Sequence, residues 1–208
     1  MTTRGIWVTG LAALLIGPGM AQAATRHATP DSVTASGSCA VTAPCTLAFA
    51  VSGASAGDTV SLAPGTYTVA ADLAASVADL TIEGASTTPV LSLGATVVVT
   101  NFAPRMTLRN LRIQGSNAGA ALVSVNSGFS GTVLDRVTVA QGADALAVAG
   151  RGLTIRNSVV TNTSTAPAIV IANGAITGST VIARGAAPAI SVSTSYVAAG
   201  GVGAVTVR

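Results

Sequence analysis

The chain has 208 residues, of which half are hydrophobic, 8% are charged and 3% are aromatic. Ala, Val, Thr, Ser and Gly dominate, whereas the Glu, Gln and Lys that long helices need are scarce or absent, so the composition favours strands. The formal net charge of +3 is small, and the arginines that supply it are scattered along the sequence, which argues against a nucleic-acid-binding protein.

Residues 1–23 have the pattern of a secretory signal peptide. Arg4 supplies a positive charge, residues 5–16 are apolar, and a Gly-Pro-Gly break leads to Ala21-Gln22-Ala23, a small-residue cleavage site. We predict cleavage after Ala23 and a secreted mature protein. A retained membrane anchor is the alternative for this segment. No later stretch reaches 18 uninterrupted apolar residues, so no stable membrane insertion is expected after cleavage.

The region after the cleavage site predicts a tail and a cap. Residues 24–38 are small, polar and of low complexity, which favours a flexible start of the mature chain. Cys39 and Cys45 are the only cysteines, and we expect them to form a disulfide in an oxidising compartment. With the distant His27 they are too few ligands for a metal, so no metal or cofactor is predicted. Thr46 can N-cap a short apolar helix that ends before Gly53 and covers one end of the domain.

One short phrase returns along the rest of the chain. Its clearest copies are Leu153-Thr154-Ile155-Arg156-Asn157 and Met106-Thr107-Leu108-Arg109-Asn110. Aligned on the apolar residue before the charged position, the copies fall 26, 26, 21 and 21 residues apart, and this set consists of Ile82, Leu108, Leu134, Ile155 and Ile176. A repeat of this length without helical segments predicts a solenoid of strands, in which these residues stack as one buried ladder.

A second apolar set supports at least two strands per coil. It consists of Leu122, Leu146, Ile169 and Ile190, spaced 24, 23 and 21 residues apart. Gly, Asn and Ser mark the corners between strands. Residues 205–208 read like another copy of the phrase, and no covering segment follows them. We therefore expect a β-helix domain over residues 39–208 that is truncated at its C-terminal end, or whose last edge pairs with another surface.

Three segments carry a family resemblance. Residues 45–51 (C-T-L-A-F-A-V), 56–67 (A-G-D-T-V-S-L-A-P-G-T-Y) and 80–84 (L-T-I-E-G) resemble the opening of secreted right-handed parallel β-helix proteins of the pectate-lyase-like superfamily. Residues 48–50 depart from the Arg-Glu-Ala of that pattern. The resemblance implies an all-β, right-handed parallel β-helix with a short N-terminal capping helix. It does not imply one activity, because the superfold carries lyases, hydrolases, esterases and adhesins.

The aligned repeats place charged residues in one outward-facing column, which consists of Glu83, Arg109, Asp135, Arg156 and Thr177. Stacked neighbours lie about 4.8 Å apart, so the alternating charges favour a surface ladder worth about 0–1 kcal/mol per exposed pair. The alternative is a catalytic cleft, because the resemblance implies acidic calcium ligands and an Arg base in pectate lyases. Glu83 and Asp135 lie two coils apart, about 10 Å, which is too far for one calcium site and at the limit for a glycosidase pair.

The next column favours coil corners with left-handed backbone, and it consists of Gly84, Asn110, Arg136, Asn157 and Gly178. A candidate binding patch for acidic glycans consists of Arg109, Arg112, Asp135, Arg136 and Arg156, since guanidinium pairs well with carboxylate. No catalytic residue is predicted. The leading hypothesis is a secreted non-catalytic module that is structural or adhesive, or that binds extracellular polysaccharide. The alternative is a polysaccharide lyase or glycoside hydrolase that acts on acidic polysaccharide.

Overall fold

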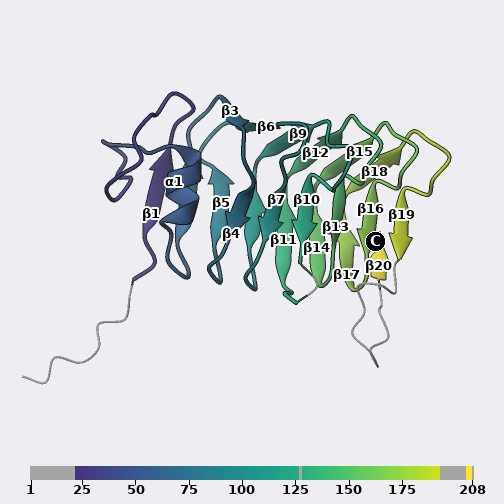
Figure 1. The fold of residues 1–208 in the computed structure, drawn as a ribbon. Helices are drawn as coiled ribbons and strands as arrows, with labels where there is room; N and C mark the ends of the chain where they lie inside the picture. Colours follow the sequence, from purple (N-terminus) through teal and green to yellow (C-terminus); the bar gives the residue numbers. More distant parts are fainter. Residues whose placement is uncertain (1–21, 127, 193–204, 208) are drawn as a thin grey trace, which may run out of the picture.

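The computed structural model describes residues 22–126, 128–192 and 205–207. The chain winds into a parallel β-helix, and the strands of successive coils lie side by side in three sheets (Figure 1). Sheet A consists of β1 (Thr25–Ala28), β2 (Thr59–Leu62), β5 (Thr81–Gly84), β8 (Thr107–Arg109), β11 (Thr132–Asp135), β14 (Leu153–Arg156), β17 (Gly174–Thr177) and β20 (Val205–Val207).

The other two sheets have six strands each among the described residues. Sheet B consists of β3 (Thr66–Val69), β6 (Val90–Leu93), β9 (Arg112–Gly115), β12 (Thr138–Gln141), β15 (Val159–Asn162) and β18 (Thr180–Ala183). Sheet C consists of β4 (Leu73–Ala75), β7 (Val99–Asn101), β10 (Val123–Val125), β13 (Val148–Gly150), β16 (Ile169–Ile171) and β19 (Ile190–Val192). The predicted right-handed parallel β-helix is confirmed, with three strands per coil where the sequence indicated at least two.

The apolar ladder predicted from the repeated phrase is confirmed in sheet A. Ile82 pairs with Leu108, Leu108 with Leu134, Leu134 with Ile155, and Ile155 with Ile176. Each of these side chains is buried. Aliphatic side chains stack on one another at every coil and fill the narrow interior. Burial of each large aliphatic side chain contributes about 1.5–3 kcal/mol to stability.

The second apolar set is wrong in its first two members. The residues in register in sheet C are Val99, Val123, Val148, Ile169 and Ile190. Leu122 and Leu146 lie in the connections that precede their strands, and Leu122 is nevertheless buried. These connections from sheet B to sheet C differ in length, spanning residues 116–122 in one coil and 142–147 in the next. A fixed spacing in the sequence therefore did not locate the strand starts.

The corner from sheet A to sheet B has left-handed backbone, as predicted, at four of the five expected positions. The φ angles are 52° at Asn110, 55° at Arg136, 51° at Asn157 and 54° at Gly178. Gly84 differs, because it is the last residue of β5 and has no positive φ. Asn and Gly tolerate this region well, whereas Arg carries a steric cost there.

The segment after the predicted cleavage site begins with a strand, where the sequence predicted a flexible tail over residues 24–38. Thr25–Ala28 form β1, which extends sheet A beyond β2. The disulfide loop satisfies the outer edge of β1: the His27 N–H donates to the Cys39 carbonyl at 2.7 Å, and the Cys45 N–H donates to the His27 carbonyl at 2.9 Å. Composition failed here because main-chain pairing, rather than apolar side chains, orders the segment.

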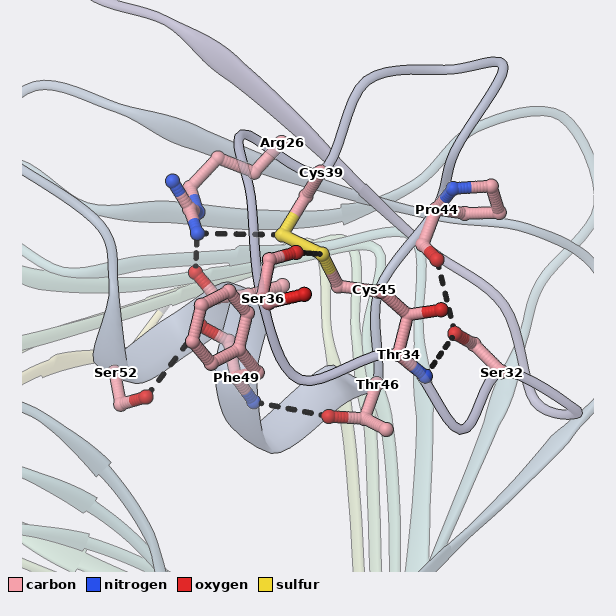
Figure 2. The surroundings of a disulfide bond; sticks show 11 residues. Arg26, Ser32, Thr34, Ser36, Cys39, Pro44, Cys45, Thr46, Phe49 and Ser52 are labelled. Carbon is pink, nitrogen blue, oxygen red and sulfur yellow. Dashed lines mark hydrogen bonds between the residues drawn. A yellow bond between two sulfur atoms is a disulfide. The ribbon is translucent and has the colours of Figure 1, made fainter.

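The predicted disulfide and helix complete the cap (Figure 2). Cys39 and Cys45 are bonded, and α1 (Leu47–Ser52) begins after Thr46, whose side chain accepts a hydrogen bond from the Phe49 N–H at 3.2 Å. α1 packs against β4, β1 and β2. Arg26 ties these parts together: Nε donates to the Ala50 carbonyl at 2.9 Å, and Nη2 lies 3.2 Å from the Cys39 sulfur.

Among the described residues, no helix is long and apolar enough to span a bilayer.

Candidate functional site

The charged column of sheet A lies in register, as the aligned repeats predicted. β5, β8, β11 and β14 bring Glu83, Arg109, Asp135 and Arg156 side by side on successive coils. Arg109 Nη1 donates to Glu83 Oε2 at 3.3 Å, and Arg156 Nη2 donates to Asp135 Oδ2 at 3.3 Å. Asp135 therefore lies between two arginines, one coil away on each side.

Asp135 is buried, which differs from the exposed ladder that the sequence predicted. Its side chain is 5% exposed, because three guanidinium groups converge on Oδ2 and cover it. Arg109 Nε lies 3.7 Å away, Arg136 Nη2 3.6 Å and Arg156 Nη2 3.3 Å. Asp135 Oδ1 and Arg109 Nε are buried and have no hydrogen-bond partner. At this position, three arginine side chains on the surface thus surround one buried carboxylate.

Arg136 joins this cluster through its corner conformation. In a continuous strand, Asp135 and Arg136 would point to opposite faces. The left-handed backbone at Arg136 turns the chain there and brings its guanidinium back to Asp135. We call Arg109, Arg136 and Arg156 around Asp135 the arginine cluster.

Arg112 does not belong to the arginine cluster, which corrects the candidate patch. It begins β9 in sheet B, on the next side of the coil, and its Nε donates to Gln114 Oε1 at 3.0 Å.

Gln114 lines an open groove of about 470 Å³ that runs across four coils of sheet B, with Ser92, Ser116, Thr161 and Thr163. This groove was not predicted from the sequence, because the repeated phrase marks the strands of sheet A and not those of sheet B.

A second ion pair lies just before two strands of sheet A, where Asp79 precedes β5 and Arg105 precedes β8. Arg105 Nε and Nη2 donate to the two carboxylate oxygens of Asp79, at 2.5 and 2.6 Å. Both residues have left-handed backbone, with φ of 60° and 64°. The hydrogen bonds from Arg105 lower the pKa of the Asp79 carboxyl, and the pair is exposed. In the sequence, Asp79 and Arg105 each directly precede a copy of the repeated phrase.

The charged column does not fit a calcium site. Its carboxylates are Glu83 and Asp135, and Arg109 lies between them and contacts both. Calcium takes six to eight oxygen ligands, whereas Asp135 Oδ2 already faces three cations. Across the part of the chain that the structure describes, no three His, Cys, Asp or Glu side chains are grouped closely enough to hold a metal.

Comparison with known proteins supports the fold. No protein-family model matches the sequence, and no curated protein is significantly similar to it. Among solved structures, the chain is similar to the crystal structure of pectate lyase Pel9A, with a TM-score of 0.60 and 14% sequence identity. The alignment covers 77% of this chain and 48% of Pel9A, so this chain spans about half the length of that enzyme. At this identity the similarity shows a pectate-lyase-like parallel β-helix fold and nothing about activity.

Proposed function

We propose that this protein is a secreted, non-catalytic β-helix module that binds acidic extracellular polysaccharide through the arginine cluster. The observation that carries the proposal is the convergence of three arginines on the buried Asp135 carboxylate. The side chains of Arg109, Arg136 and Arg156 remain 39%, 57% and 47% exposed. The cluster therefore presents more positive than negative charge to solvent.

The cluster suits a carboxylated or similarly charged chain. Each guanidinium has five N–H donors, and its contact with Asp135 occupies only part of them. Because Asp135 holds the guanidinium groups in place, less side-chain entropy is lost when a ligand carboxylate pairs with the remaining donors. The stacking of Arg109 and Arg156 on strands β8 and β14, either side of β11, spreads these donors along the solenoid axis.

The conformation of Arg136 supports a binding role. The equivalent corner holds Asn110, Asn157 or Gly178 in other coils, and all four residues have φ between 51° and 55°. A long side chain in this region costs about 1–2 kcal/mol. An Arg at a corner where Asn or Gly would be more stable supports a functional role for its charge.

The position of Asp135 favours binding over catalysis. A general acid or base must come within hydrogen-bond reach of the substrate. Asp135 Oδ1 is buried, and Oδ2 is covered by the three guanidinium groups. Glu83 is separated from Asp135 by the coil that carries Arg109. The pair is therefore poorly placed to act on one glycosidic bond.

The proposal is tested by measuring the binding of polygalacturonate to the mature protein by calorimetry. Arg136→Asn should weaken binding about two- to fivefold, since one exposed charge contact is worth up to about 1 kcal/mol. The same variant should gain thermal stability, because Asn tolerates the left-handed corner better. Arg156→Gln should weaken binding without that gain. Arg184→Gln, which removes an exposed positive charge that directly follows β18 in sheet B and lies outside the arginine cluster, is the matched control.

Equal affinity in all four proteins would contradict a role for the arginine cluster. No binding to any acidic polysaccharide would contradict the proposal as a whole and leave a structural or adhesive rod. Added salt should weaken true cluster binding, because exposed charge contacts are screened over about 8–10 Å at physiological ionic strength.

A polysaccharide lyase or glycoside hydrolase is the second candidate, and the fold shared with pectate lyase Pel9A favours it. Turnover of an acidic polysaccharide by the mature protein, lost in Asp135→Asn, would establish it in place of the binding module. Binding without turnover would support the first proposal.

A further inference from the structure

Asp58 is a buried carboxylate that accepts two main-chain hydrogen bonds next to the start of sheet A. Its Oδ1 accepts from the Ala24 N–H at 2.8 Å, and its Oδ2 accepts from the Ser55 N–H at 2.8 Å. The residue is 4% exposed. Within the described part of the chain, no Arg or His side chain forms an ion pair with Asp58, so the carboxylate is buried beside neutral donors.

The Ala24 nitrogen is also the atom that the predicted processing step would change. Hydrolysis of the Ala23–Ala24 amide bond consumes one water, leaves a carboxylate on Ala23 and leaves an α-amine on Ala24 that is protonated at neutral pH. We infer that Asp58 is the binding site for the α-ammonium group that cleavage creates, so that maturation replaces a hydrogen bond from a neutral N–H with an ion pair. This inference rests on the secretion proposed above and is independent of the arginine cluster.

The cleavage position fits the structure on both sides of the bond. Gln22 and Ala23, on the side that would be removed, are exposed and precede β1. Ala24, by contrast, is held at both main-chain groups: its N–H donates to Asp58, and its carbonyl accepts from the Thr59 N–H at 2.9 Å. Cleavage after Ala23 thus leaves every strand of sheet A intact and places the new terminus against the carboxylate.

Processing would give the buried Asp58 carboxylate a positively charged partner. A buried carboxylate is costly unless a cation or enough hydrogen bonds compensate it. The bond from the neutral Ala24 N–H to the carboxylate is already charge-assisted, and a protonated amine would add the attraction of a full positive charge. The pair would also link the first residue of the mature chain to the turn that precedes β2, and so stabilise the pairing of β1 with β2.

The absence of lysine makes the test selective. The sequence contains no Lys, so after cleavage the α-amine of Ala24 is the one primary amine in residues 24–208. We would purify the secreted protein, identify its first residue by mass spectrometry, and acetylate the folded protein with an N-hydroxysuccinimide ester of acetic acid. The measurements are the acetylation rate and the Tm before and after modification. The variants are Asp58→Asn and, as a matched control, Asp144→Asn, which removes a carboxylate that accepts the Thr165 N–H in a distant coil.

The expected first residue is Ala24. The folded wild type and Asp144→Asn should react at least about threefold more slowly than Asp58→Asn, because pairing holds the amine in its unreactive protonated form. Acetylation should lower the Tm of the wild type by about 3 °C or more and leave that of Asp58→Asn nearly unchanged.

A first residue other than Ala24 would show that the predicted cleavage after Ala23 does not occur, and this would overturn the inference. The polysaccharide proposal would be unaffected, because it is tested separately. With Ala24 confirmed, equal reaction rates in wild type and Asp58→Asn would overturn the pairing. An acetylation-induced Tm change of the same size in both proteins would overturn it as well. The wild-type measurement stands without the variant: a Tm that acetylation of the folded wild type leaves unchanged would overturn the pairing whether or not Asp58→Asn folds.

Discussion

The Tyr67 hydroxyl donates to the Ala28 carbonyl at 2.8 Å and so ties β3 to the end of β1, 39 residues earlier in the chain. The same hydroxyl lies 3.0 Å from the Ala63 carbonyl. Burial raises the pKa of Tyr67 from 10.0 to about 12. The protonated phenol is therefore favoured in the folded state.

This shift predicts a loss of stability at high pH. Because the folded-state pKa is the higher one, the stabilisation is fully present below about pH 10 and is lost as the pH rises towards 12. The loss should reach about 2 kcal/mol by pH 11.5, measured by urea unfolding at pH 8, 10 and 11.5. Tyr67→Phe should cost about 1 kcal/mol at pH 8 and should be less sensitive to pH in this window. Identical pH profiles for the two proteins would contradict this role of Tyr67.

Asp135→Asn should destabilise the fold by about 1–3 kcal/mol, more than an exposed charge pair would. The substitution keeps the size of the side chain but removes the charge on which three guanidinium groups converge. Chemical unfolding at low and high salt is the measurement. Glu83→Gln is the matched control, since Glu83 is more exposed and, among the arginines that the structure describes, pairs with Arg109 alone. It should cost less than about 1 kcal/mol. A loss of the same small size in both variants would mean that the column is an ordinary surface ladder.

Leu108→Ala should cost about 2–5 kcal/mol, because Leu108 is fully buried between Ile82 and Leu134 and its truncation leaves a cavity. Thr107→Ala, one residue earlier on the outward face, should change stability by less than about 0.5 kcal/mol. Thermal or chemical unfolding of the two variants checks the register of sheet A. Comparable losses in both would show that the ladder is misplaced.

Replacing both Cys39 and Cys45 with Ser should cost about 2–3 kcal/mol, as expected for a short loop closed by a disulfide. The effect should begin locally, because the loop supplies the hydrogen bonds that cover the outer edge of β1. Amide hydrogen exchange should accelerate at His27 and Cys45 before it does at Leu134. Uniform acceleration across the three sites would argue that the disulfide stabilises the whole domain and not the cap.

Sheet A could be predicted from the sequence because each of its clearest strands contrasts an apolar anchor with a charged neighbour and ends in a residue suited to left-handed backbone. Ile155, Arg156 and Asn157 show all three signals, and the structure confirms them. Sheets B and C lack this contrast. Val148 and Ala149 are both buried although they point to opposite faces, so alternation could not reveal their register.

The arginine cluster was predictable in part. Repeat alignment brought Arg109, Asp135 and Arg156 together, because in-register parallel strands stack equivalent positions. It could not show that Asp135 is buried, since that depends on a third guanidinium. Arg136 provides it: the sequence predicted the left-handed corner at Arg136 and its place in the patch, but not that its guanidinium returns to cover Asp135 Oδ2. Arg112 lies in another sheet, because the chain turns at Asn110 before β9 begins.

The capping elements β1, residues 39–45 and α1 all precede the first complete coil in the sequence. From β5 onwards to β19, each strand pairs with a partner that lies 21–26 residues earlier. A chain that emerges N-terminus first from a ribosome or a translocation pore thus delivers its template before the strands that need one. Every new coil meets an edge that is already formed, so assembly can follow the direction of synthesis, and the growing end is the main place where an unpaired edge awaits its neighbour.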